Sequence, residues 1–176
     1  MSLGRYLGGL ALAVGLAAPA AHATMMVKPM TLDEVTAESK HVVHGVVTSV
    51  VSERDEHGLP ATWTTFAVAE TLKGAAAHTL TIKQYGVARP LADGTLTRLS
   101  GMPRYEVGEE VVLFLRGASR RGFTSPVGLG QGTYRVKRRD GRTTPEVRGD
   151  DGTAAPQDLA AFVGKVKAKA RAQESR

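Results

Sequence analysis

Positively charged side chains gather in one stretch of the chain. Between residues 116 and 148 there are nine Lys and Arg but only two Asp and Glu, a net charge of +7. Alternate residues of a strand face the same side, and here the apolar Tyr134 and Val136 alternate with basic residues. This pattern predicts a basic surface that binds an anionic partner. Its candidate residues are Arg135, Lys137, Arg139, Arg142, Arg120 and Arg121.

Two interpretations of this basic surface stay open. One is that it binds an acidic protein surface, an envelope polymer or lipid headgroups. The other is that it is a solvated sheet face whose charges prevent edge-to-edge association. Nucleic acid is not expected, because no aromatic residue shares the outer strand face and the chain is predicted to be exported.

A hairpin is predicted to present these cations. Asp140-Gly141 is a strong signal for a type I′ turn. With that turn, the predicted cross-strand pairs are Arg139 with Arg142, Lys137 with Thr144, and Arg135 with Glu146.

Residues suited to catalysis or metal binding are sparse. The chain has no Cys, which excludes a thiol nucleophile, a disulfide scaffold and every Cys-ligated metal site. His41 and His44 have the spacing of helical metal ligands, but residues three apart on a strand face opposite sides. The Gly-rich run 128–132 precedes a predicted strand, so it lacks the helix N-terminus that would receive a phosphate. We therefore expect no enzymatic activity, no cofactor and no metal.

The first 23 residues have the layout of a secretory signal peptide. Arg5 supplies the positive end, the apolar run covers residues 7–18, and Ala21-His22-Ala23 is a small-residue cleavage site. The apolar run is shorter than the roughly 20 residues that cross a bilayer. We expect cleavage near Ala23 and a periplasmic or secreted protein without an integral membrane segment. An uncleaved anchor is the alternative.

Composition and periodicity predict how the remaining chain is organised. Of the 176 residues, 42% are hydrophobic and 23% charged, which is ordinary for one globular domain. The capping-box pattern Thr31-Leu32-Asp33-Glu34 predicts a short helix to about Ser39. Strands are predicted at 42–51, 62–72, 79–85, 111–115, 132–138 and 143–148. Together these elements predict a mainly β domain over 24–156, folded as a small barrel or sandwich.

Two further segments are distinctive. The stretch 86–108 is longer than the usual limit of about 12–15 residues for a loop, so we expect it to be functional or to contain a further strand. Residues 157–176 form a predicted amphipathic helix with a basic tail, packed on the domain or trailing from it. Its apolar stripe is Leu159, Phe162, Val163, Val166 and Ala170.

Motifs in the first three strands also suggest a family. The opening Val42-Val43-x-Gly45 and the later Phe66-x-Val68-x-x-x-Leu72-Lys73-Gly74 are similar to the netrin-like domain, over about residues 39–86. The best-known members of that family are the tissue inhibitors of metalloproteinases, and the resemblance implies an OB-type barrel. Residues 108–114 and 128–132 look more like a group of exported bacterial proteins with no assigned activity.

The resemblance implies an alternative function, inhibition of a protease. In the inhibitors an N-terminal Cys chelates the zinc of the target, whereas Thr24 would begin the mature chain here. An inhibitory edge would combine the processed N-terminus with the turn at 53–58. Its residues would be Thr24, Met25, Asp55, Glu56 and His57.

The sequence therefore predicts an exported, non-enzymatic binding module that contacts a protein or an anionic envelope component through its basic hairpin and loops. A protease inhibitor or metalloprotease-associated protein is the alternative.

Overall fold

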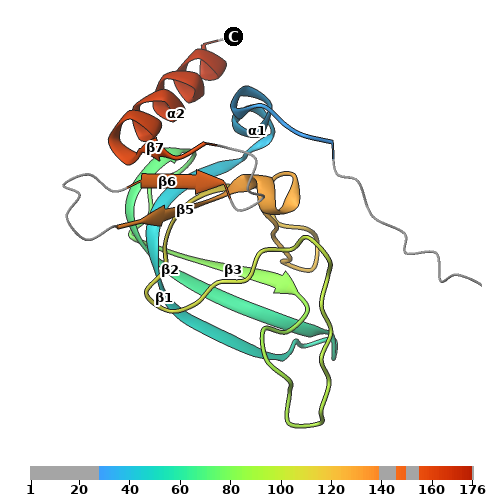
Figure 1. Cartoon of the computed structure of the whole chain (residues 1–176). Coiled ribbons are helices and arrows are strands. Elements are labelled where there is room, and N and C mark those ends of the chain that lie inside the picture. Colours follow the sequence, from blue (N-terminus) through green and yellow to red (C-terminus); the bar gives the residue numbers. More distant parts are fainter. Residues whose placement is uncertain (1–27, 139–145, 150–154, 176) are drawn as a thin grey trace, which may run out of the picture.

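The computed structural model describes residues 28–138, 146–149 and 155–175. The predicted signal peptide, Thr24, Met25, Arg139 and Arg142 lie outside the described residues. The fold is mainly β, with two α-helices and a short 3-10 helix (Figure 1). In chain order the elements are α1 (Leu32–Glu38), β1 (His41–Arg54), β2 (Pro60–Lys73), β3 (Thr79–Tyr85), β4 (Glu110–Leu115), η1 (Leu129–Gly132), β5 (Thr133–Lys137), β6 (Glu146–Gly149), β7 (Gln157–Asp158) and α2 (Leu159–Glu174).

The strands form one antiparallel sheet in the order β3-β2-β1-β4-β5-β6-β7. The two longest strands, β1 and β2, pair along most of their length, and β1 also pairs with β4. In the described part of the chain no ladder joins β3 to β5 or to β7, so the sheet is open. The structure is mainly β as predicted, but instead of the small barrel or sandwich it has a single sheet that is not closed into a barrel.

The edge of β3 is covered by a loop instead of a closing strand. Lys83 and Phe123 form an isolated bridge, and the N–H of Thr124 donates to the carbonyl oxygen of Lys83 at 2.8 Å. The Gly-rich stretch 117–132 thus crosses this edge without forming a regular ladder. The edge of β3 is therefore covered without a further strand being added to the sheet.

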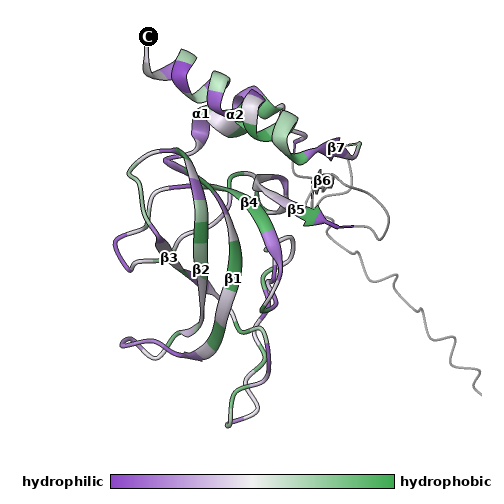
Figure 2. Ribbon diagram, turned by 90° about the vertical axis from the view of Figure 1, so that its left-hand side faces the viewer, coloured by the Kyte–Doolittle hydropathy of each residue, from purple (hydrophilic) through white to green (hydrophobic). Residues whose placement is uncertain are grey.

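Each face of the sheet has its own apolar core. One core packs the sheet against both helices and includes Phe114 and Phe162, whereas the other includes Phe66 and Leu113. Figure 2 shows the hydrophobic segments in β1, β2, β4 and α2. The continuous apolar run of β4 is explained by this arrangement, since its residues alternate between the two cores. β4 lies in the middle of the sheet.

Each α-helix begins after a residue whose side chain caps it. At α1, the N–H of Glu34 donates to Oγ1 of Thr31, and the N–H of Thr31 donates to the Glu34 carboxylate at 2.7 Å. The backbone and side-chain hydrogen bonds from Thr31 lower the pKa of Glu34. Asp158 caps α2, and the predicted stripe of that helix packs on the sheet, with Phe162 and Val166 fully buried. No helix in the described ranges is long and apolar enough to span a membrane.

The register of the predicted hairpin is wrong by two residues. Lys137 pairs with Glu146 instead of Thr144, and Arg135 pairs with Arg148. In the predicted register Pro145 would stand opposite Val136 inside the ladder, although proline has no N–H to donate. In the observed register β6 begins immediately after Pro145.

Candidate binding site

Arg135 of the predicted basic surface and the neighbouring Arg138 form ion pairs with acidic residues at the start of β4. Arg135 donates to the Glu109 carboxylate, and Arg138 binds both oxygens of Glu110. Lys137 is exposed, and Val136 faces the core as predicted. These acidic partners lie 26 and 28 residues away in the sequence. Only the pairing of β4 with β5 brings them beside the cations, so local sequence patterns missed them.

Arg120 and Arg121 lie at the β3 edge of the sheet, not beside β5. They line an open groove of about 480 Å3 together with Glu56, His57 and Trp63. The structure thus gathers two residues predicted for the basic surface with two predicted for an inhibitory edge. Because both charge signs are present, the groove is not a purely cationic surface.

Asp55 is turned into the protein instead of projecting from the 53–58 turn. Its Oδ1 accepts the N–H of His57 at 2.9 Å and that of Leu59 at 2.8 Å, and its side chain is fully buried. Its Oδ2 lies 3.0 Å from Nζ of Lys83. Burial acts to raise the pKa of Asp55, but the hydrogen bonds from Lys83, Leu59 and His57 hold it below its ordinary value. This geometry makes Asp55 a structural residue of the turn.

Lys83 joins this turn to the loop that covers β3. Its ammonium donates to the carbonyl oxygen of Arg121 at 3.1 Å and lies 4.6 Å from the ring centroid of Phe123. Burial acts to lower the pKa of Lys83, but the hydrogen bond to Asp55 and the nearby carboxylates raise it above its ordinary value. These contacts with Asp55, Arg121 and Phe123 hold the turn and the loop together. The loop above β3 leaves Lys83 only 9% exposed, which strand alternation alone does not reveal.

The segment 86–108 is an ordered loop without a regular helix or strand. At its base, the N–H of Gly86 donates to Pro60, and Oγ1 of Thr62 donates to the carbonyl oxygen of Gly86. At its tip, Arg54 donates to Asp93 from two nitrogens. The hydrogen bonds from Thr95 and Arg54 strongly lower the pKa of Asp93. These contacts hold the loop over the sheet, at the end furthest from the helices (Figure 1).

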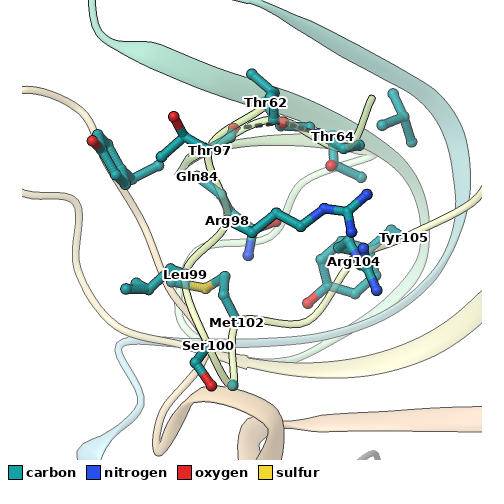
Figure 3. Close-up of a pocket in the computed structure, with 16 residues that line it drawn as sticks. Thr62, Thr64, Gln84, Thr97, Arg98, Leu99, Ser100, Met102, Arg104 and Tyr105 are labelled. Atoms are coloured by element: carbon teal, nitrogen blue, oxygen red, sulfur yellow. Dashed lines mark hydrogen bonds between the residues drawn. The ribbon is translucent and has the colours of Figure 1, made fainter. Parts of the chain in front are cut away.

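A pocket of about 360 Å3 lies between this loop and the sheet. Figure 3 shows the labelled side chains around it. The strands contribute Thr62, Thr64 and Gln84, all buried. The apolar lining comes from Val50, Val87, Leu99, Met102 and the ring of Tyr105. The lining therefore combines apolar side chains with several polar ones, and this combination suits a small molecule that has both apolar and polar parts.

Two guanidinium groups lie at this pocket. Arg98 and Arg104 come from the loop, are exposed, and form no ion pair with any described residue. Figure 3 shows the Arg98 side chain reaching across the pocket toward Arg104. Arg89, in the same loop, lines an adjoining groove that also includes Arg104. Unpaired guanidinium groups beside a pocket favour binding of an oxyanion.

Comparisons with known proteins identify no family for this chain: no family model matches it, and no curated protein matches its sequence. Within the described ranges, no three His, Asp or Glu side chains come together as a metal site would require. The arrangement at the loop therefore has to be interpreted from its own geometry.

Proposed function

We propose that this chain is a non-enzymatic binding module that holds an anionic partner at the arginines of the 86–108 loop. The observation that carries the proposal is the pair Arg98 and Arg104, two guanidinium groups at one pocket with no ionic partner among the described residues. The planar fork of each group matches a carboxylate or phosphate, and a charge without a partner gains most from binding one.

The hairpin cations contribute less to this function than charge counting suggests. Arg135 and Arg138 already contact Glu109 and Glu110. An incoming anion would have to compete with these carboxylates for the same donors. An anionic partner would therefore contact the loop arginines before the hairpin.

Retention on a carboxymethyl matrix tests the proposal. The variant R98Q/R104Q removes two cations without ionic partners, whereas the control R116Q/R138Q removes two cations that contact Glu38 and Glu110. Both variants lower the net charge by the same amount. We expect R98Q/R104Q to elute at clearly lower salt than the control. Equal elution of the two variants would overturn the proposal.

Export remains part of the proposed function. The signal-peptide pattern of residues 1–23 supports secretion followed by cleavage near Ala23. Expression of the full chain followed by N-terminal sequencing of the exported product tests this, and a product beginning at Thr24 is expected. Retention of the uncut chain in the membrane fraction would contradict it.

We also propose that the sheet is a variant of the OB-type barrel implied by the netrin-like resemblance. The position of β1 between β2 and β4 supports this, because an OB-type barrel is a partly open five-stranded Greek key. His44 faces Glu70 on one side and Val112 on the other. NMR contacts from His44 to both neighbours are expected, and the lack of either would contradict the arrangement.

A further inference from the structure

We infer that the pocket beneath the 86–108 loop takes a small amphipathic anion, with an oxyanion at one end, an apolar body and a hydrogen-bonding group at the other. This inference rests on the proposed function and adds the chemical class of the ligand. Its starting point is the volume of about 360 Å3, which lies near the lower end of the range of about 300–1,000 Å3 for small-molecule sites.

Thr64 indicates where the hydrogen-bonding group of this ligand would bind. Its side chain is 1% exposed, it lines the pocket, and its Oγ1 has no hydrogen-bond partner among the described residues. The neighbouring Thr62, on the same face of β2, donates to the carbonyl oxygen of Gly86 at 2.9 Å. A buried hydroxyl without a partner is uncommon in folded proteins. A ligand hydroxyl or carbonyl that reaches Oγ1 of Thr64 would satisfy it.

The anionic end is assigned by the two loop arginines. Arg98 and Arg104 belong to the same pocket as Thr64, and Figure 3 shows the Arg98 side chain spanning the region between Thr64 and Arg104. The oxyanion would therefore lie at the exposed guanidinium groups, while the body of the ligand extends toward the buried wall. A second hydrogen-bonding group near that wall distinguishes this ligand from a simple fatty acid.

The residues between these two ends indicate the shape and the apolar character of the ligand's body. Val87 and Tyr105 are 3% exposed and form a rigid apolar wall, whereas Leu99 is 46% exposed and lies on the loop side. Flat or slender apolar groups fit between such walls better than highly hydrated sugars do. An aromatic or short aliphatic body meets this requirement.

Three probes of nearly equal size separate these contributions. The probe 4-hydroxyphenylacetate carries both polar ends, phenylacetate lacks the hydroxyl, and tyrosol has an alcohol in place of the carboxylate. Titration calorimetry with the full-length mature chain is expected to give the tightest binding for 4-hydroxyphenylacetate. One neutral hydrogen bond corresponds to a loss of about three- to tenfold for phenylacetate.

Variants at Thr64 and Arg98 assign each end of the probe. T64V should bring 4-hydroxyphenylacetate down to the affinity of phenylacetate, whereas T64S, which keeps the hydroxyl, should preserve the difference. R98Q should weaken both acids and leave tyrosol unchanged. If T64V fails to fold, the affinities of the wild-type chain and of T64S for the two acids still test the inference. Both chains keep the hydroxyl, so both should bind 4-hydroxyphenylacetate more tightly than phenylacetate.

Several results would overturn the inference. Equal affinity of the wild-type chain for both acids would exclude a role for Thr64, as would an unchanged preference in T64V. Binding of neither acid would exclude the pocket as a small-molecule site. In that case retention on the carboxymethyl matrix that still depends on Arg98 and Arg104 would leave the proposed function standing. Loss of that dependence would refute the proposed function itself.

Discussion

Arg138 binds Glu110 through two hydrogen bonds, with Nε 2.9 Å from one carboxylate oxygen and Nη2 3.0 Å from the other. The same carboxylate lies 2.9 Å from Nε2 of His44. A conspicuous cation of the hairpin is therefore engaged within the protein. Charge counted along the sequence overestimates the charge that this hairpin offers to a partner.

Replacing Glu110 should strengthen binding to an anionic matrix. In E110Q the amide no longer provides a charged partner, so Arg138 becomes available. We expect E110Q to elute from a carboxymethyl matrix at higher salt than E53Q. The control E53Q raises the net charge equally at an exposed residue that forms no ion pair within the described ranges. Identical elution of E110Q and E53Q would show that Glu110 does not limit Arg138.

The pair Asp55 and Lys83 should be important for stability. D55N keeps Oδ1 as an acceptor for the N–H groups of His57 and Leu59, so it mainly removes the charge beside Lys83. Removing one member of a buried ion pair leaves the other uncompensated. We expect the melting temperature of D55N to fall by more than about 5 °C at neutral pH. The double variant D55N/K83M should recover part of this loss; a further additive loss would argue against coupling.

The pair Asp55 and Lys83 should also make the free energy of unfolding depend on pH in a defined way. The folded-state pKa of Asp55 lies below its ordinary value of 3.8, so its contribution is complete above pH 3.8 and is lost as the pH falls through the lower value. The pKa of Lys83 lies above 10.5, so its contribution is lost only when the pH rises through that higher value. The difference in unfolding free energy between wild type and D55N should be constant from about pH 5 to 9 and shrink in acid. Denaturant titrations measure it, and a difference that grows in acid would contradict the assignment.

Two glycines should respond oppositely to alanine. A Cβ at Gly132 would lie 2.6 Å from the carbonyl oxygen of Val127 and 2.9 Å from that of Phe114. A Cβ at Gly164, in the middle of α2, would meet nothing within 4 Å. We expect G132A to cost about 1–3 kcal/mol of unfolding free energy. G164A should add about 0.5–1 kcal/mol through helix propensity. Destabilisation by G164A would contradict the helical environment of that residue.

The capping box of α1 should make a measurable contribution. T31A removes the hydroxyl that accepts the N–H of Glu34 and should lower the unfolding free energy by about 1 kcal/mol. T31S keeps that acceptor and should remain close to wild type. Chemical denaturation measures both variants. Equal losses in T31A and T31S would show that the methyl group, not the cap, stabilises this end.

Features set by local chemistry could be predicted from the sequence. The capping box at Thr31 and the stripe of α2 depend on residues close together in the chain, and the structure has them where they were expected. What lies against the edge strand β3 could not be predicted in the same way. Whether β3 meets a strand or a loop depends on how residues 117–132 fold back, which no periodicity encodes.

The site was predicted only in part, for the same reason. The length of the segment 86–108 predicted a functional loop or a further strand; the segment contains no strand, and it lines the pocket together with β2 and β3. The basic residues of 116–148 drew attention because they are clustered in the sequence, whereas Arg98 and Arg104 are isolated there. Arg98 and Arg104 stand out as unpaired only once ion pairs are assigned, because the pairing of Arg135 with Glu109 and of Arg138 with Glu110 depends on contacts between distant strands.

Chemical-shift mapping tests most directly whether the loop, and not the hairpin, holds the anion. Titrating 4-hydroxyphenylacetate into the labelled mature chain should shift amide signals of the 86–108 loop and of Thr64, because these line the pocket. Signals of β5 and β6 should move little. Shifts confined to β5 and β6, with the loop unchanged, would contradict the account.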